Sequence, residues 1–246
     1  MGFIKHYQSI KQTLALFSKT RRDTIDCNEL RRAERKKSKR TTVINTCANF
    51  LNAQNYLEIG VRNPDDNFNK VQVNTKTSVD PGLEFGENPA TYPMTSDAFF
   101  ELWKEKCLAP YDLIFIDGLH LAEQVSRDIR HALEMSSPNG LIMLHDCNPP
   151  NRYFARENYY EINPAKGSWN GTTYKAAWEY AFTGNFEMRI VDCDMGIGVI
   201  SKMKPKSPQE NPNPYFEWNR FEIIREESGL LIDEEGLMVW LNSIKK

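Results

Sequence analysis

The chain has 246 residues, of which 40% are hydrophobic and 26% are charged, and its formal net charge is −2. This length and balance are typical of a folded protein with a substantial core, and the net charge argues against a general nucleic-acid-binding protein. No apolar stretch approaches the roughly 20 residues needed to cross a bilayer, so no transmembrane segment is expected.

Residues 1–53 are predicted to form an N-terminal helical segment that contains a basic stretch. Apolar residues recur at helical spacing over residues 3–18 and again over residues 43–51. Between Lys19 and Arg40, ten Lys or Arg residues stand against four Asp or Glu residues. A run of this kind suits a solvated helix face or linker, and it also suits contact with phosphates or anionic lipid.

In residues 54–203, short apolar runs alternate with amphipathic stretches. Strands are expected over residues 56–61, 77–80, 92–96, 113–116 and 141–144, and helices over residues 97–103, 122–134 and 172–182. Residues 187–192 and 198–200 are expected to form an antiparallel pair. The predicted fold class is therefore α/β, with a doubly wound, mostly parallel Rossmann-like sheet that has an antiparallel edge and is flanked by N-terminal and C-terminal helices.

Residues 204–246 are predicted to be a Pro-rich linker followed by C-terminal helices that pack on this domain. The linker covers residues 204–214, a helix is expected near residues 216–225, and a short helix ends at Val239, Trp240 and Leu241.

Ionisable side chains follow two of the predicted strands. Asp117 and His120 come after the run 113–116, and His145 and Asp146 come directly after the run 141–144. Ligands of open α/β sheets bind at the carboxyl ends of the strands, so these four side chains are expected to share one binding rim.

The first two strands also end in acidic residues. Glu58 precedes Gly60 at the end of the first strand, and Asp80, which lies 22 residues after Glu58, ends the second and can accept both hydroxyls of a ribose. The loop over residues 60–67 has one glycine and two acidic residues, so it lacks the G-x-G-x-x-G pattern that binds a pyrophosphate. A cationic or zwitterionic nucleoside suits this loop better, which favours S-adenosylmethionine over NAD.

These motifs resemble those of bacterial class I S-adenosylmethionine-dependent methyltransferases, in the branch of surface-glycan and macrocin-type sugar O-methyltransferases. The resemblance covers about residues 54–202. Its motifs are Glu58 to Arg62, Val79 to Pro81, Thr95 to Phe100, Asp112 to His120, His145 to Pro150, Trp169 to Gly171, and Asp192 to Ile200.

The resemblance implies roles for the matched residues. The residues implied in cofactor binding are Glu58, Gly60, Asp80, Ser96, Asp97 and Asp117. Glu58 and Gly60 would border the methionine part of the cofactor, Asp80 would hold the ribose, and Ser96 or Asp97 would lie near the adenine. Asp117, His145 and Asp146 would hold a divalent metal, expected to be Mg²⁺ because carboxylates suit a hard cation. His120, His145 and Asp117 form the implied catalytic set, in which a histidine accepts the proton of the substrate hydroxyl.

Several residues have an alternative structural interpretation. Asp117 and Asp146 are also suitable caps for the helices that follow them, and Asp80 before Pro81 is a good turn residue in any case. The aromatic-rich segment over residues 152–169 is either a substrate lid or a packed loop. Pro64 stands near the place where relatives carry a second glycine, and proline fixes φ and removes a backbone donor.

The leading hypothesis is a cytoplasmic S-adenosylmethionine-dependent O-methyltransferase that acts on a sugar hydroxyl of a glycan or a glycosylated small molecule. One alternative is a non-catalytic methyltransferase-like scaffold in glycan assembly, which the Pro64 loop motivates. Another is a metal-dependent hydroxylase on the same fold. The cytoplasmic assignment follows from five widely spaced cysteines without a C-x-x-C pair and from the lack of a signal-peptide pattern. No nucleic-acid partner is expected, and a homo-oligomer is compatible with the sequence.

Overall fold

The computed structural model describes residues 2–83 and 87–245, and its centre is a seven-stranded sheet. The strand order is β2-β1-β3-β4-β6-β5-β7. Strands β2, β1, β3 and β4 are parallel, β6 is antiparallel to both of its neighbours, and β5 pairs with β7 in parallel. The strands are β1 Asn55–Ile59, β2 Thr75–Val79, β3 Tyr111–Ile116, β4 Ser136–Leu144, β5 Phe186–Val191, β6 Ile197–Pro205 and β7 Leu231–Ile232.

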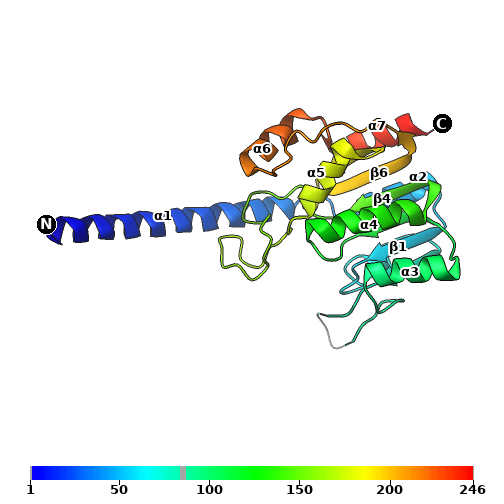
Figure 1. Cartoon of the computed structure of the whole chain (residues 1–246), viewed down its shortest axis with the longest axis horizontal. Helices are drawn as coiled ribbons and strands as arrows, with labels where there is room; N and C mark the ends of the chain where they lie inside the picture. The colour runs from blue at the N-terminus through cyan, green and yellow to red at the C-terminus, as the bar shows by residue number, and fades with distance from the viewer. Residues whose placement is uncertain (1, 84–86, 246) are drawn as a thin grey trace.

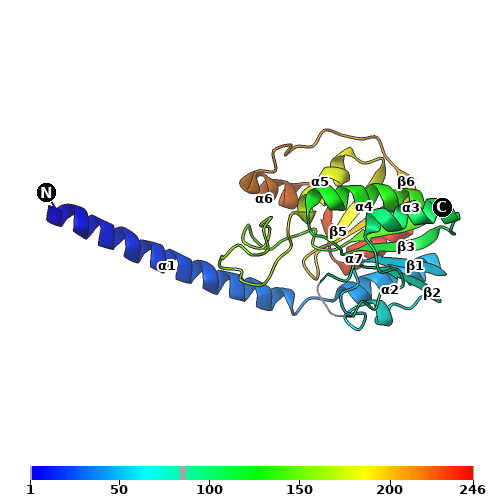
Figure 2. The same cartoon turned by 60° about the horizontal axis from the view of Figure 1, so that its bottom comes forward.

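Helices cover both faces of this sheet, as Figure 2 shows. Helices α3, α4, α5 and α6 contribute side chains to the core on one face, whereas α2 and α7 do so on the other. This is the doubly wound, Rossmann-like arrangement expected from the sequence. The helices are α1 Gly2–Glu34, α2 Arg40–Leu51, α3 Ser96–Lys106, α4 Ala122–Met135, α5 Thr173–Thr183, α6 Trp218–Glu227 and α7 Glu234–Ile244, with a 3-10 turn η1 at Phe68–Lys70.

The central strands supply alternate side chains to the two cores. In β3, Ile114 and Ile116 pack under α4, while Leu113 and Phe115 pack on the face that carries α2. All four side chains are nearly inaccessible to solvent. Because successive side chains of a strand point to opposite faces, a strand buried on both sides must be apolar throughout, as these runs are.

Two elements differ from the sequence prediction. The strand expected over residues 92–96 is reduced to a single bridge between Tyr92 and Val79, and α3 begins at Ser96. Pro93 follows the bridge and has no backbone N–H to continue a ladder. The two-residue strand β7 was not expected, because so short a run carries no periodic pattern.

The N-terminal segment divides into two parts with different surroundings. Helix α1 is continuous from Gly2 to Glu34 and extends away from the sheet (Figure 1). Leu14 and Phe17, from the predicted apolar face, are exposed, and the apolar side chains of residues 3–10 lie outside the described residues. Helix α2 instead buries Val43 and Ile44 against the sheet, so it is an integral layer of the α/β unit. Among the described helices, none is long and apolar enough to cross a membrane.

Candidate active site

The carboxyl ends of β1, β3 and β4 meet at one rim. Gly60 directly follows β1 with a φ of +92°, and a Cβ at this position would collide with the backbone of Asp117, which follows β3. Only glycine allows the two chain segments to approach so closely. Asp146, which follows β4, has a φ of +60°. This left-handed conformation ends the strand beside His145.

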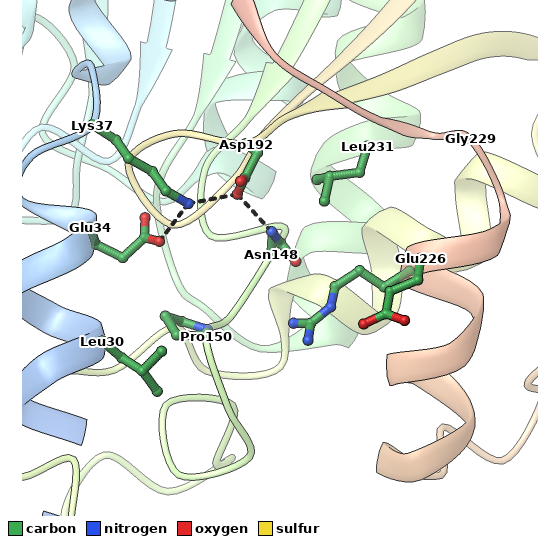
Figure 3. A pocket seen from close by; sticks show the side chains of 10 residues that line it. Leu30, Glu34, Lys37, Asn148, Pro150, Asp192, Glu226, Gly229 and Leu231 are labelled. Carbon is green, nitrogen blue, oxygen red and sulfur yellow. Dashed lines mark hydrogen bonds and ion pairs between the residues drawn. The ribbon is translucent and has the colours of Figure 1, made fainter. Parts of the chain in front are cut away.

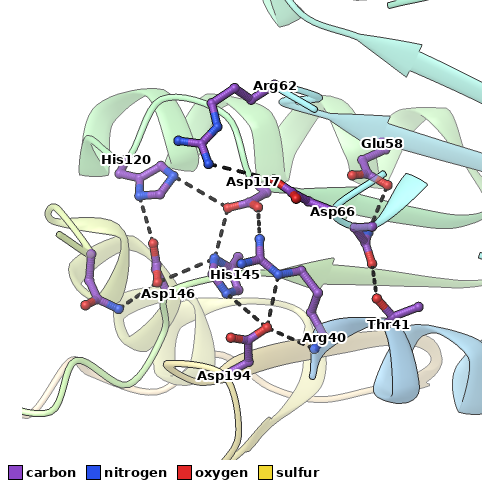
Figure 4. A network of polar contacts seen from close by, with 12 residues as sticks. Arg40, Thr41, Glu58, Arg62, Asp66, Asp117, His120, His145, Asp146 and Asp194 are labelled. Atoms are coloured by element: carbon purple, nitrogen blue, oxygen red, sulfur yellow. Dashed lines mark hydrogen bonds and ion pairs between the residues drawn. The ribbon is translucent and has the colours of Figure 1, made fainter. Parts of the chain in front are cut away.

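The four ionisable residues predicted at the strand ends form one network of ion pairs (Figure 4). His120 Nδ1 lies 2.8 Å from a carboxylate oxygen of Asp146, and its Nε2 lies 3.5 Å from Asp117. His145 Nδ1 lies 3.0 Å from Asp117 and 3.4 Å from Asp146. Each histidine therefore bridges the same two carboxylates.

Two further charged residues complete the network. Arg40, at the start of α2, contacts Asp117 through Nη1, and its Nε donates to Asp194 over 3.1 Å. The backbone N–H of Arg40 also donates to Asp194 over 3.0 Å. Arg40 lies at the end of the basic stretch, whose interpretation as a solvated face does not apply to this residue. Asp194 lay within a motif of the family resemblance, but no role was predicted for it.

The network is balanced in charge. Burial alone would lower the pKa of His120 and His145, but Asp117 and Asp146 outweigh burial and raise these pKa values to about 10 and about 9, with Arg40 opposing the rise at His145. Burial would raise the pKa of Asp146, but His145 and His120 lower it to about 2. At neutral pH three carboxylates therefore face three cations: Asp117, Asp146 and Asp194 face Arg40, His120 and His145.

The aromatic segment after β4 covers one side of this network. Trp169 stacks on His120 with ring centroids 5.1 Å apart and planes 6° from parallel. Tyr159 packs edge-on against Trp169, and Asn170 donates a hydrogen bond to Asp146 over 2.6 Å. The segment thus contacts the candidate catalytic residues through Trp169 and Asn170, while Tyr160 and Ile162 within it are exposed.

Glu58 lies at the same rim in a different environment. Its side chain is buried and accepts hydrogen bonds from Tyr56 Oη at 2.6 Å and Asn67 Nδ2 at 3.0 Å. Burial raises the pKa of Glu58 to about 7, against the effect of these two hydrogen bonds. Arg62, in the loop that follows β1, forms an ion pair with Asp66 at 3.7 Å.

The other predicted cofactor residues make local contacts. Asp80 accepts a hydrogen bond from the backbone N–H of Gly82 over 2.6 Å, as expected for a turn residue. Ser96 donates its hydroxyl to Asp128 over 2.6 Å, so this side chain is engaged between α3 and α4. Asp97 is more accessible and pairs with Arg127 at 3.4 Å.

The three predicted metal ligands are close enough to share an ion. One ligand atom each from Asp117, His145 and Asp146 lie within 4.8 Å of one another, and two carboxylates with one imidazole suit a divalent cation. Their alternative role as helix caps is not observed, since Leu121 and Thr172 occupy the N-cap positions of α4 and α5. Arg40 and His120 already contact the same carboxylates, so a metal ion would compete with them.

One family model matches part of the chain. Residues 27–147, which include β1 to β4 and the strand-end residues up to Asp146, match the family model described as a methyltransferase domain. Comparison with curated proteins gives no match.

Several solved structures are similar to the chain. They include an O-methyltransferase from Bacillus cereus in complex with SAH, with 13% identity, coverage of 71% of this chain and 89% of that chain, and a TM-score of 0.44. The O-methyltransferase TomG from Streptomyces achromogenes, in complex with SAM, has 11% identity, coverage of 65% and 78%, and a TM-score of 0.46. The SAH-bound methyltransferase PaMTH1 from Podospora anserina has 16% identity, coverage of 75% and 88%, and a TM-score of 0.45.

Proposed function

We propose that this chain, which carries a methyltransferase domain, transfers the methyl group of S-adenosylmethionine to a hydroxyl oxygen of a sugar in a glycan or a glycosylated small molecule. The observation that carries the proposal is the meeting of three strand ends, where Gly60 brings the end of β1 against the backbone of Asp117, whose carboxylate pairs with His120 and His145. A donor at β1 and an acceptor at β3 and β4 would lie side by side there.

The residues at the ends of β1 and β2 suit a nucleoside that carries a positive charge. Bound S-adenosylmethionine supplies an electrophilic methyl group. Asp117 provides a carboxylate and Glu58 a hydrogen-bond acceptor beside the Gly60 turn, and Asp80 provides a carboxylate for the ribose hydroxyls. Of the two residues predicted near the adenine, Asp97 suits the role better, because the Ser96 hydroxyl is engaged by Asp128.

His120 and His145 are the proposed proton acceptors. Asp117 and Asp146 raise the pKa of both histidines, which favours their protonated forms. The residue that acts as the base must therefore release this proton before it can accept one from the sugar hydroxyl. His120 also stacks on Trp169, which fixes the orientation of its ring.

Asp117, His145 and Asp146 are the proposed ligands of Mg²⁺ when the ion is present. A bound divalent cation lowers the pKa of a coordinated hydroxyl and orients it. Arg40 already places a positive charge against Asp117, so the ion and this guanidinium are alternatives at that carboxylate. The cytoplasm is the proposed compartment, in agreement with five free cysteines.

Calorimetric titration with S-adenosylhomocysteine, with and without Mg²⁺, tests the proposed cofactor. We expect micromolar binding that weakens at least tenfold in Asp80→Ala, because the ribose loses its carboxylate, and that is unchanged in Asp112→Ala at the opposite end of the sheet. Absence of binding at millimolar ligand would overturn the methyltransferase proposal and favour the scaffold hypothesis.

Substitution of the two histidines tests the proposed base. His120→Gln and His145→Gln keep hydrogen-bonding groups in place but cannot accept the proton. Loss of a general base typically lowers kcat by about 10²–10⁴-fold, and binding of S-adenosylhomocysteine should persist. If both variants keep wild-type kcat, neither histidine is the base.

A further inference from the structure

A cavity of about 450 Å³ lies beside the charged network. It is bounded by the last turns of α1, the segment that follows β4, and the connection between α6 and β7 (Figure 3). This volume is within the range of about 300–1,000 Å³ that is typical of small-molecule sites. The family model ends at residue 147, so most of the cavity wall comes from parts of the chain outside that match.

Three chain segments contribute to both the cavity and the charged network. Asn148 lines the cavity two residues after Asp146, and Asp192 lines it two residues before Asp194. Lys37 lines it three residues before Arg40. Because a chain spans at most about 3.6 Å per residue, the Cα atoms of these pairs lie within about 7–11 Å of each other. The cavity and the charged network are therefore built on the same three chain segments.

Asn148 presents an unsatisfied acceptor at the cavity wall. Its side chain is only 9% exposed, and its Nδ2 donates to Asp192 over 3.0 Å. Its Oδ1 is buried and has no hydrogen-bond partner among the described residues. Figure 3 shows this oxygen turned away from Asp192. Buried polar atoms are nearly always hydrogen-bonded, so this one calls for a donor from a ligand or from water.

The charges around the cavity disfavour an anionic ligand. Lys37 is 2.7 Å from Glu34 and 2.8 Å from Asp192, and is thus shared between two carboxylates. Arg225 donates one N–H to the carbonyl of Pro149 over 3.2 Å, and Glu226 follows it in α6. Three carboxylates against two cations give a formal charge of −1, so a phosphate would face net repulsion.

An uncharged polyol matches these groups. A hydroxyl both donates and accepts, so one hydroxyl can satisfy Asn148 Oδ1 while another accepts from Arg225 or donates to Glu226. Leu30, Pro150 and Leu231 add apolar surface for the C–H groups of a ring.

We propose that this cavity binds the methyl acceptor, and that the acceptor is presented there as an uncharged sugar rather than a sugar phosphate or a nucleotide-linked sugar. The proposal rests on the proposed function, since it assigns the place of the sugar in that reaction. Asn148, Arg225 and Glu226 then determine which sugar is accepted, while the charged network acts on its hydroxyl.

Saturation-transfer NMR with the full-length protein and S-adenosylhomocysteine tests this without turnover. The probes are methyl α-D-glucoside, methyl α-D-mannoside and methyl α-L-rhamnoside, with mannose 6-phosphate as the anionic comparison. We expect saturation transfer to at least one glycoside and none to the phosphate. Transfer to none of the glycosides, or stronger transfer to the phosphate, would overturn the proposal.

Matched variants locate the binding. Leu30→Trp places a large ring in the cavity and should reduce the saturation transfer at least fivefold, whereas Glu29→Trp, at the exposed neighbouring position, should not. Glu226→Gln should change the preference among the glycosides, whereas Glu227→Gln should not. Unchanged transfer in Leu30→Trp would exclude the cavity. Calorimetry measures whether the same variants bind S-adenosylhomocysteine. A loss of cofactor binding, which would contradict the proposed function, is therefore distinguished from a loss of sugar binding.

Discussion

Carboxylates in two regions of the same rim have pKa values shifted in opposite directions. The pKa values of Asp117 and Asp146 are lowered, because Arg40 and two histidines face them. The pKa of Glu58 is raised, because it is buried and its hydrogen-bond donors, Tyr56 and Asn67, are uncharged. Burial is common to both regions, so the charge of the partners determines the direction of the pKa shift.

Asp117→Asn should give the largest loss of stability, since it removes the carboxylate that Arg40, His120 and His145 share. Breaking a buried ion pair by removing one partner typically costs about 3–5 kcal/mol. Urea unfolding at pH 7 measures this loss as a change in the free energy of unfolding. Asp112→Asn is the control, because the Asp112 carboxylate accepts backbone N–H bonds from Gln54 and Asn55 at the other end of β3. Equal losses in both variants would contradict the shared role of Asp117.

Arg40→Met should have the next largest effect, and it tests whether the arginine and a metal ion compete for the same carboxylates. The variant leaves three carboxylates with two histidines, so the carboxylate of Asp117 that paired with Arg40 becomes available to a divalent cation. We expect reduced stability without metal and at least tenfold tighter Mn²⁺ binding by calorimetry. Lys37→Met is the matched control, since its carboxylate partners are Glu34 and Asp192. Unchanged Mn²⁺ affinity in Arg40→Met would show that the arginine and the metal do not compete.

Glu58→Gln should have a smaller effect, which depends on pH and has the opposite sign. The pKa of Glu58 rises from 4.5 to about 7 on folding, so its side chain is protonated in both states well below pH 4.5, and between pH 4.5 and 7 it increasingly lowers the stability of the folded state. The variant should match the wild type at pH 4.5 and exceed its stability by at least about 1 kcal/mol at pH 8. Thermal unfolding at both pH values checks this, with exposed Glu101→Gln expected to show no such difference. If the stability difference between Glu58→Gln and the wild type were the same at both pH values, the raised pKa would be contradicted.

The sequence predicted the strand ends well because their signals are local. Strands β3 and β4 are continuous apolar runs, and Asp117, His120, His145 and Asp146 follow them directly. Arg40 and Asp194 carried no such signal, since Arg40 lies 77 residues from Asp117 and 154 residues from Asp194. Only the packing of α2 on the sheet brings them together. At Tyr92 the apolar pattern predicts a strand, but the neighbouring Pro93 has no backbone N–H and ends the pairing after one bridge.

Helix α1 connects two sides of the charged network mechanically. Its last third is fixed to the loop after β4, where Tyr153 donates to Asp23 over 2.6 Å and Arg31 donates to Ser168 over 2.6 Å. The same helix leads through residues 35–39 to Arg40, while the loop leads to Trp169 and Asn170. Residues 11–22 project from the body over about 18 Å of helix. The position of the Arg40 guanidinium and that of the aromatic cover over the network therefore both depend on how this one helix is anchored.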